Sequence, residues 1–366
     1  MRPSQTEITE KERRVRELLE RKGLEALLIS RQANFAWLTC GGDNHVGIAT
    51  EVGSASLLVT REAKWLVCDN IEAGRVMEEE LGGLDYQQSP YQWYEGSLPQ
   101  AVGKLVRGKL GADTPMADAG LVESDLARLR YSLLPEEVQR YRWLGARCGE
   151  VMRYAAGAAE PGMTEHEIAG LIGAGLLKLG IIPTVLLVAT DDRAFSYRHP
   201  IPTYRKLEKH AMLVLCGRRW GLICSLTRMV HFGTLDAELR RKHEVVARVD
   251  ATFIAHTKPG AVAGEIFGQA MEAYKSTGFG EEWKLHHQGG ATGYAGRDYK
   301  ATAANTEIVQ PNQAFAWNPS ITGTKSEDTI IALPDRTEII SNSPDWPMLQ
   351  ITIGDQTIAR PGILMR

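Results

Sequence analysis

The sequence has no long apolar run, and from its first residues we expect no leader segment. It has no stretch of about 18 consecutive apolar residues, and Met1 begins a polar, charged segment rather than a basic region followed by an apolar one. The five cysteines are scattered and odd in number, without the paired Cys-x-x-Cys spacing of a zinc or redox motif. These absences predict a protein that neither spans a membrane nor is secreted, and that stays reduced in the cytoplasm.

Strong charge of either sign is also missing. The 42 lysines and arginines nearly balance the 45 aspartates and glutamates, which leaves a formal net charge of −3. Such a balance gives no electrostatic reason to expect a nucleic acid or an anionic membrane as a partner. A phosphate-binding loop is lacking too, because Gly289-Gly290 has neither the lysine nor the helix context that such a loop needs. We expect a small-molecule substrate, no nucleic acid and no cofactor.

The length and composition favour two domains, since 366 residues with 43% hydrophobic content can bury two cores. Residues 7–22 have the pattern of an amphipathic helix, and Gly23 lies just past its end. Further along, the pattern predicts three strands and a helix, over residues 26–30, 55–60, 65–68 and 71–81. Together these elements indicate an N-terminal α/β unit.

A domain boundary is predicted just before Pro135, which opens a long helical pattern that continues to Ala158. We therefore expect an N-terminal domain at 1–133 and a second domain at 134–366. The second domain carries a weak internal repeat with a constant offset of 98 residues, in which Pro161-Gly162, Glu167-Ile168, Gly170 and Gly180 recur as Pro259-Gly260, Glu265-Ile266, Gly268 and Gly278. A repeated helical unit predicts two related halves that face each other across a cleft.

The segment 212–233, MLVLCGRRWGLICSLTRMVHFG, predicts a β-hairpin at the centre of the second domain. Two short apolar runs flank a turn predicted at Gly217-Arg218-Arg219. Alternate residues of a strand share one face, so a hairpin can hold side chains in a fixed register. The stretch 211–233 contains no aspartate or glutamate.

This hairpin resembles the central hairpin of the pita-bread (peptidase M24) family, which includes methionine aminopeptidases, proline-specific aminopeptidases and dipeptidases, and creatinase. In its metallopeptidases the hairpin ends in Asp-x-Thr-Arg, a second aspartate lies eleven residues earlier, and both aspartates bind metal. Thr227-Arg228 matches this frame and puts Ser225 and Val214 at the two aspartate positions. Neither residue can replace a carboxylate that bridges two cations.

The other three metal-ligand positions of the family can be matched as well. The ligand histidine, which precedes a glycine by three residues, corresponds to His287. The first glutamate, which precedes a proline, corresponds to Asn318, and the second, in a Glu-Asp-Thr strand, corresponds to Glu327. Two of the five ligands are retained, and one histidine with one glutamate should bind metal weakly at best. The resemblance therefore implies a protein that binds no metal and whose mechanism is most similar to that of the metal-independent creatinase.

The resemblance also implies a fold and an assembly. We expect an α/β (α+β) protein, with an N-terminal creatinase/prolidase-type domain followed by a C-terminal pita-bread domain with a pseudo-twofold repeat. The repeat at an offset of 98 residues supports this fold independently of the ligand positions. A homodimer is expected, because family members commonly complete the site with the neighbouring N-terminal domain.

His199, His287 and Glu327 are the candidate catalytic residues. His199 lies in a loop stiffened by two prolines, and its unperturbed pKa of about 6.5 suits proton transfer. The resemblance places it where creatinase moves a proton. His287 would donate a hydrogen bond to a substrate oxygen or hold Glu327, whose carboxylate needs a partner in an apolar strand.

Five further residues are candidates for substrate binding: Thr227, Arg228, His286, Arg297 and Asn318. Creatinase holds its cationic substrate with two glutamates, and the matching positions here carry Thr227 and Asn318, which suit a neutral amide, carbonyl or hydroxyl. Arg228 could bind a carboxylate or tie two strands together. Arg297 lies in a Gly-Arg-acid stretch similar to that of creatinase, and His286 adds a second imidazole beside His287.

The first functional hypothesis is a metal-independent, creatinase-like hydrolase that cleaves an amide or amidine C–N bond of a small molecule, with His199 as general acid/base. The alternative is an Xaa-Pro metallo-aminopeptidase or dipeptidase, which would need ligands that the hairpin lacks. A lyase or isomerase that only transfers protons, or a non-catalytic binding protein on the same fold, fits the same residues.

Overall fold

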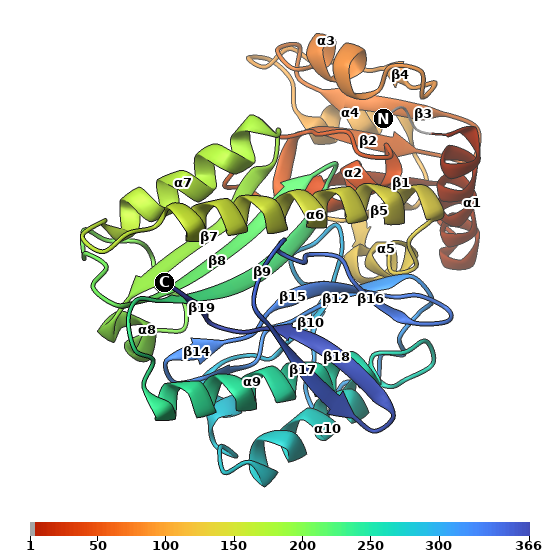
Figure 1. The fold of residues 1–366 in the computed structure, drawn as a ribbon. Coiled ribbons are helices and arrows are strands. Elements are labelled where there is room, and N and C mark those ends of the chain that lie inside the picture. Colours follow the sequence, from red (N-terminus) through yellow and green to blue (C-terminus); the bar gives the residue numbers. More distant parts are fainter. Residues whose placement is uncertain (1–3) are drawn as a thin grey trace. The chain divides into compact units, whose positions relative to one another are not determined.

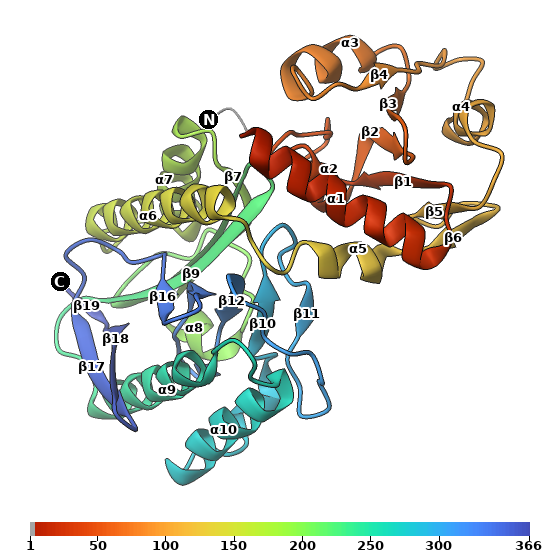
Figure 2. The same ribbon diagram turned by 90° about the vertical axis from the view of Figure 1, so that its right-hand side faces the viewer.

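The computed structural model describes residues 4–366, which form two compact units (Figures 1 and 2). Of these residues, the first unit contains 4–137 with Trp220–Leu222, and the second contains Val138–Arg219 with Ile223–Arg366. Both units combine helices with β-sheets, so the expected α/β architecture is confirmed. Within residues 4–366, no helix is both long enough and apolar enough to cross a membrane.

A six-stranded mixed sheet forms the centre of the first unit, in the order β4-β3-β2-β1-β5-β6. The neighbours of β1 are the antiparallel β2 and the parallel β5, and the apolar residues of β1 are buried. A near-continuous apolar run suits such an interior strand. The elements are α1 (Gln5–Lys22), β1 (Ala26–Arg31), α2 (Gln32–Leu38), β2 (Val52–Val59), β3 (Lys64–Cys68), α3 (Ala73–Arg75), the π-helical turn η1 (Val76–Glu80), β4 (Gln87–Gln88), α4 (Leu98–Leu105), β5 (Leu110–Ala112), β6 (Ala119–Leu121) and α5 (Glu123–Leu129).

Helix α1 forms where the amphipathic pattern predicts it. The Ser4 hydroxyl accepts a hydrogen bond from the backbone N–H of Glu7, and Gly23 ends the helix in the left-handed conformation, with φ of 60°. The helix predicted over residues 71–81 is divided into the short α3 and η1.

Two larger sheets organise the second unit: one in the order β19-β9-β8-β7 and the other in the order β11-β10-β12-β15-β16. Helices α9 and α10 lie side by side in both views (Figures 1 and 2). The helices are α6 (Pro135–Ala158), α7 (Glu165–Lys178), α8 (Asp192–Ser196), α9 (Ala237–His256), α10 (Ala263–Ser276) and the 3-10 turn η2 (Glu282–Leu285). The strands are β7 (Ile182–Thr190), β8 (His210–Arg219), β9 (Leu222–His231), β10 (Gly289–Thr292), β11 (Tyr299–Lys300), β12 (Gln313–Trp317), β13 (Ser320–Ile321), β14 (Thr324–Lys325), β15 (Asp328–Ala332), β16 (Thr337–Ile339), β17 (Met348–Ile353), β18 (Gln356–Pro361) and β19 (Leu364–Met365).

The internal repeat is visible in the structure. Helices α7 and α10 have 14 residues each and start 98 residues apart. The glycines that recur with them adopt positive φ in both copies: Gly162 and Gly260 before the helices, at 96° and 90°, and Gly180 and Gly278 after them, at 65° and 85°. Glycine recurs at these turns because it reaches positive φ without a steric penalty. The repeat of one helical unit that the sequence predicts in the second domain is therefore confirmed.

The central hairpin consists of β8 and β9, but its turn lies three residues later than expected. Trp220 and Gly221 both have positive φ, 52° and 75°, as a two-residue hairpin turn of type I′ requires. Gly217, the expected turn residue, instead lies within β8. A Cβ atom there would lie 2.7 Å from Ile181 Cγ2 and 2.9 Å from Cys148 Sγ, so close packing rather than a turn requires this glycine.

His243 on α9 gives the second unit a specific sensitivity to acid. It is buried, its Nε2–H donates to the carbonyl of Pro361 at 2.9 Å, and its Nδ1 lies 2.6 Å from Thr324 Oγ1. Burial is the main cause that lowers the pKa of His243 to about 4. Between about pH 6.5 and this value the unfolded chain binds a proton that the folded chain excludes, so acidification lowers stability by up to about 1.4 kcal/mol per pH unit.

We therefore expect His243→Gln, which keeps one donor and one acceptor, to make this loss of stability less steep by about that amount. Urea unfolding at pH 7, 6 and 5 measures the slope, and the exposed His166→Gln is the matched control. Equal slopes in wild type and His243→Gln would contradict the expectation.

Candidate active site

The end of the hairpin brings Thr227 and Glu327 together. Strand β9 forms an antiparallel bridge at Thr227↔Glu327, directly before β15, and the Thr227 hydroxyl donates to Glu327 Oε2 at 2.7 Å. Ser225, two residues earlier on β9, exchanges hydrogen bonds with the Thr329 side chain. These contacts join the two sheets of the second unit and fix the position of the Glu327 carboxylate.

Two cations surround this carboxylate. Lys325 Nζ lies 3.0 Å from Glu327 Oε2, Arg297 Nη2 lies 3.5 Å from Oε1, and the Lys325 and Glu327 side chains are only 4% and 3% exposed. Burial alone would raise the pKa of Glu327, but the charges of Lys325 and Arg297 and the hydrogen bond from Thr227 outweigh it and hold the pKa below its usual value. Glu327 is therefore ionised at neutral pH.

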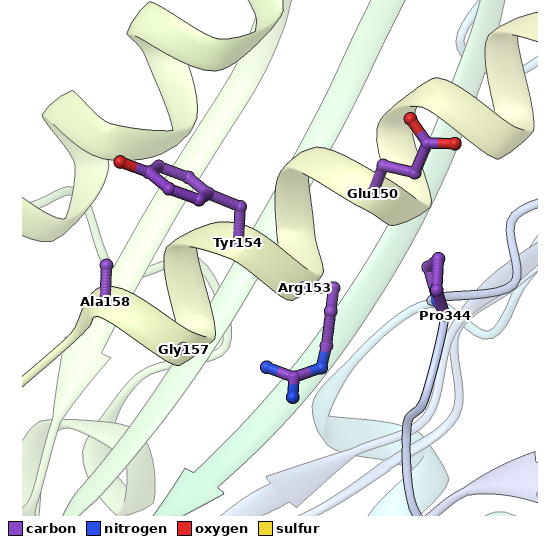
Figure 3. A pocket seen from close by; sticks show the side chains of 6 residues that line it. All are labelled: Glu150, Arg153, Tyr154, Gly157, Ala158 and Pro344. Carbon is purple, nitrogen blue, oxygen red and sulfur yellow. The ribbon is translucent and has the colours of Figure 1, made fainter.

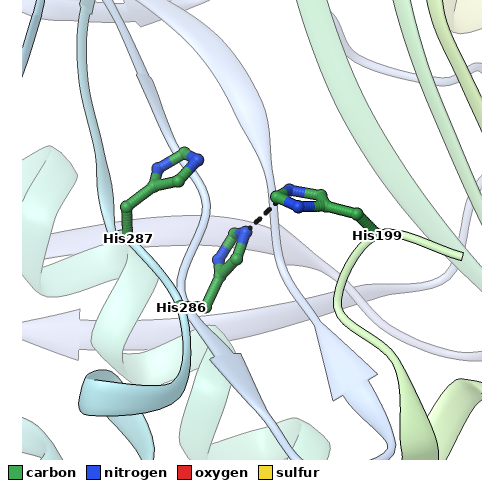
Figure 4. Close-up of side chains that lie close together, drawn as sticks. All are labelled: His199, His286 and His287. Carbon is green, nitrogen blue, oxygen red and sulfur yellow. Dashed lines mark hydrogen bonds between the residues drawn. The ribbon is translucent and has the colours of Figure 1, made fainter.

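Three histidines lie together next to this ion pair (Figure 4). His199 follows α8 on an exposed loop, whereas His286 and His287 lie between η2 and β10. The Nε2 atoms of His199 and His286 are 3.0 Å apart, and the stacked rings of His286 and His287 have centroids 4.5 Å apart. One candidate catalytic residue, His199, thus meets another, His287, as well as the candidate binding residue His286.

All three imidazoles have lowered pKa values. Burial is the largest cause in each, and the positive charge of Lys325 contributes to all three. The pKa of His286 falls to about 2 and that of His287 to about 4, and the pKa of His199 is also below its usual value. The three rings are therefore neutral at pH 7, with nitrogen lone pairs available for a proton or a ligand.

Glycines fix the backbone that follows His287. A Cβ atom at Gly289 would lie 2.2 Å from the carbonyl oxygen of Ala316, and one at Gly290 would lie 2.2 Å from that of Tyr299. Strand β10 can pair closely on both sides only because these positions lack side chains. The Gly289 N–H also donates to His287 Nδ1, at 3.3 Å. The partners that hold Glu327 are Thr227, Lys325 and Arg297 rather than His287.

The remaining predicted binding residues differ in how much they can reach a substrate. Arg297 is 17% exposed, and within residues 4–366 its Nε has no hydrogen-bond partner. Asn318 is buried, and its Oδ1 likewise has no partner in that part of the chain. Arg228 is 2% exposed, and all three of its guanidinium nitrogens bond within the protein, to partners that include Asp328 and Ser343. Of the two roles considered for Arg228, the structure thus favours tying strands together.

Lys325 is the site residue that the sequence analysis missed. It lies two residues before Glu327, so in extended backbone the two side chains point to the same face. A buried glutamate needs a counter-charge, and this spacing was the signal that could have identified it.

A separate surface cavity of about 460 Å³ lies along α6 (Figure 3). Its lining residues are Glu150, Arg153, Tyr154, Gly157, Ala158 and Pro344. These six residues include no histidine, cysteine or pair of carboxylates. The cavity therefore offers no catalytic group comparable to the cluster around His199.

Both units of the chain match known protein families. The sequence model of metallopeptidase family M24 matches residues 139–340, and that of the creatinase/prolidase N-terminal domain matches residues 12–132. The first match covers more than half of the chain, so this protein belongs to the M24 family. It is therefore an enzyme, a hydrolase of that family.

Relatives with described activities support this family assignment. An Xaa-Pro dipeptidase of Lactobacillus helveticus is 24% identical over 288 residues, which cover 75% of this chain and 74% of the relative. Among solved structures, an Xaa-Pro dipeptidase from Bacillus anthracis has a TM-score of 0.78 at 18% identity, over 98% of this chain and 100% of that one. A prolidase from Pyrococcus horikoshii OT3 also has a TM-score of 0.78, at 16% identity, over 91% and 98%. The structural similarities establish the fold.

These comparisons contradict the expected metal-independent, creatinase-like function. The matching family is one of metallopeptidases, and the similar proteins are Xaa-Pro dipeptidases and a prolidase. The prediction was wrong because it inferred the reaction from a few lost ligands, whereas family membership is carried by residues throughout 139–340.

The residues present nevertheless do not fit the two-metal centre that the resemblance implies. Val214 packs in an apolar cluster with Leu187 and Met229, and the Ser225 hydroxyl contacts Cys216 Sγ at 3.1 Å. Neither residue offers a carboxylate. The positive charges next to Glu327 come from the ammonium of Lys325, at 3.0 Å, and the guanidinium of Arg297, at 3.5 Å. A pair of bridged cations would need anionic ligands that these positions do not supply.

Proposed function

We propose that this protein cleaves the peptide bond before proline in short peptides, as an Xaa-Pro dipeptidase. The observation that carries the proposal is that the clustered polar side chains all lie within residues 139–340, the part that matches family M24: His199, His286, His287, Arg297, Lys325 and Glu327. The Lactobacillus helveticus relative, described as an Xaa-Pro dipeptidase, supports the same substrate class.

Arg297 suits the carboxylate end of such a substrate. Its guanidinium is partly exposed, its Nε has no partner within the described residues, and its salt bridge with Glu327 holds its position. A guanidinium pairs with a carboxylate through charge-assisted hydrogen bonds. A dipeptide that ends in proline would therefore be oriented by its carboxylate.

His199 suits contact with the substrate. Its ring is exposed and neutral at pH 7, so one ring nitrogen carries an N–H that can donate a hydrogen bond to the carbonyl oxygen of the scissile peptide bond. Glu327, which is buried and ionised, stays bound to Lys325 and Arg297 and keeps the charged wall of the site in place.

The direct test is release of proline from Ala-Pro by the full chain, supplied in turn with zinc, cobalt and manganese. We expect cleavage of Ala-Pro and no cleavage of Pro-Ala, with Ala-Ala as a second control. Absence of proline release under all three conditions would contradict the proposal, as would equal rates on Ala-Pro and Ala-Ala.

Arg297→Leu is expected to lower kcat/KM for Ala-Pro by roughly 10- to 150-fold, mainly through KM, because a hydrogen bond to a charged group is worth about 1.5–3 kcal/mol. The wild type and the variant should act equally on Ala-Pro amide, which lacks the carboxylate. The exposed Arg240→Leu on α9 is the matched control. An equal loss on the acid and the amide would show that Arg297 does not bind the carboxylate.

A homodimer and a cytoplasmic location belong to the same proposal. The five cysteines are free thiols, and four of them are buried, which fits a reducing compartment. The homodimer is supported by the resemblance to pita-bread enzymes. Light scattering on the full chain should give twice the mass of one chain.

A further inference from the structure

We infer that His199, His286 and His287 form a binding site for one transition-metal ion of the zinc(II) or cobalt(II) type. Their ligand nitrogens lie within 4.8 Å of one another, and the Nε2 atoms of His199 and His286 are 3.0 Å apart. Zinc–nitrogen bonds of about 2.0–2.1 Å in tetrahedral geometry put neighbouring nitrogens about 3.4 Å apart. The nitrogens of His199 and His286 are thus close to this spacing. The longest nitrogen–nitrogen distance, up to 4.8 Å, exceeds the tetrahedral spacing by about 1.4 Å, so the third ring needs to move by no more than that.

The ring positions support a shared ligand. In Figure 4 the imidazoles of His286 and His287 both extend toward His199. The Gly289 N–H donates to His287 Nδ1 at 3.3 Å and helps to hold this ring in place. Gly289 and Gly290 pack closely at the start of β10 and fix the backbone that follows His286 and His287. The ligand nitrogens of these two histidines are therefore positioned before an ion binds.

His286 shows an independent sign of a missing partner. It is only 8% exposed, yet its Nδ1 has no hydrogen-bond partner within residues 4–366. His286 also lines a small cavity of about 10 Å³, whose lining is mostly apolar but includes the polar residues Arg198, Ser320, Thr324 and Lys325. That volume is about the minimum for one water. With the metal on Nε2, the Nδ1–H can donate into this cavity, as metal-bound histidines usually donate through their other nitrogen.

His199 provides access and leaves coordination space. It is exposed, whereas His286 is buried and His287 is intermediate. An ion can therefore enter from the His199 side. Three protein ligands with the fourth position open to water or substrate is the arrangement found in catalytic zinc sites.

The ligand chemistry selects the metal and the number of ions. Imidazole favours zinc, cobalt, nickel and copper, whereas magnesium, calcium and manganese prefer carboxylates and water. The ammonium of Lys325 is paired with Glu327 at 3.0 Å, which removes that carboxylate from the ligands of a second ion. Lys325 and Arg297 also repel a dication, and Glu327 offsets part of that charge, so affinity should depend on all three imidazoles.

Titration of the full, chelator-treated chain with cobalt(II) tests the site. We expect one equivalent to bind with the visible absorption of four-coordinate cobalt, zinc to displace it and manganese to leave it in place. His199→Ala changes an exposed loop residue and should weaken binding by at least about 10- to 100-fold, the effect seen when even outer partners of metal ligands are changed. His286→Gln should act similarly, and the exposed His166→Ala is the matched control.

The inference is overturned if the wild type binds neither cobalt nor zinc, or if both variants bind as the wild type does while circular dichroism shows them folded. If the wild type instead bound two equivalents of cobalt with equal affinity, and Glu327→Gln lost both, the result would indicate the two-metal centre of the family. Metal binding is measured without a peptide, so its failure is distinct from failure of the proposed cleavage. Proline release without cobalt or zinc binding would overturn only the metal site.

Discussion

Replacing Arg360 by methionine is expected to lower the free energy of unfolding by about 3–5 kcal/mol, the cost of removing one partner from a buried ion pair. Arg360 on β18 has a fully buried side chain, and its Nη2 lies 2.5 Å from Asp250 Oδ2 and 2.7 Å from Asp328 Oδ2. Asp328 also pairs with Arg228, at 2.9 Å. The variant would leave the buried carboxylate of Asp250, on α9, without its cation.

The loss should depend on pH in a defined direction. Burial raises the pKa of the Asp250 carboxyl to about 6, although Arg360 opposes the rise. Without Arg360 the pKa rises further, and the folded variant relieves the charge by binding a proton that the unfolded chain releases. The variant should therefore lose less stability at pH 5.5 than at pH 8.

Urea unfolding at both pH values measures this effect, with Arg336→Met as the control. Arg336 is 59% exposed and pairs with Asp335, so its replacement should change stability by no more than about 0.5 kcal/mol. Similar small losses in the two variants would show that the buried network contributes no more than a surface pair.

Glu327→Gln is expected to cost about 3–5 kcal/mol for the same physical reason, because it leaves the buried ammonium of Lys325 without its carboxylate. Lys325→Met should also destabilise the protein, since Glu327 would retain Arg297 only at 3.5 Å. The double variant removes both charges. It should therefore be more stable than the sum of the two single losses predicts, with a coupling of about 0.5–3 kcal/mol.

The control is the same double-mutant cycle on an exposed ion pair, Arg241 and Glu238 on α9. Both side chains are 54% exposed, and a surface pair of this kind couples by about 0.2–1 kcal/mol. If the Lys325–Glu327 cycle gave no more than the surface cycle, the view that the ammonium balances Glu327 would be wrong.

Much of the fold could be predicted from the sequence because it depends on periodic patterns. The glycines that recur at an offset of 98 residues mark the positive-φ turns around α7 and α10, and the pattern of residues 7–22 gives α1. The hairpin turn was misplaced because Gly217 serves close packing against Ile181, which no local pattern reveals. The domain boundary between residues 133 and 134 stays a prediction.

The site was less predictable, because its partners are distant in the sequence. Resemblance to a family identified His199 and His287, which lie in separate segments and meet only in the fold. That His286, rather than His287, directly contacts His199 could not be read from two adjacent histidines. Lys325 was missed because one lysine carries no motif, although its spacing from Glu327 placed both on one face.

X-ray absorption spectroscopy on the zinc-loaded full chain tests the central claim most directly, namely that this M24 site holds one ion through imidazoles in place of the family's two-metal centre. We predict about one zinc per chain, with three imidazole nitrogens at about 2.0–2.1 Å and one oxygen ligand from water. A shell dominated by carboxylate oxygens, with a second metal at about 3.5–4 Å, would contradict the account.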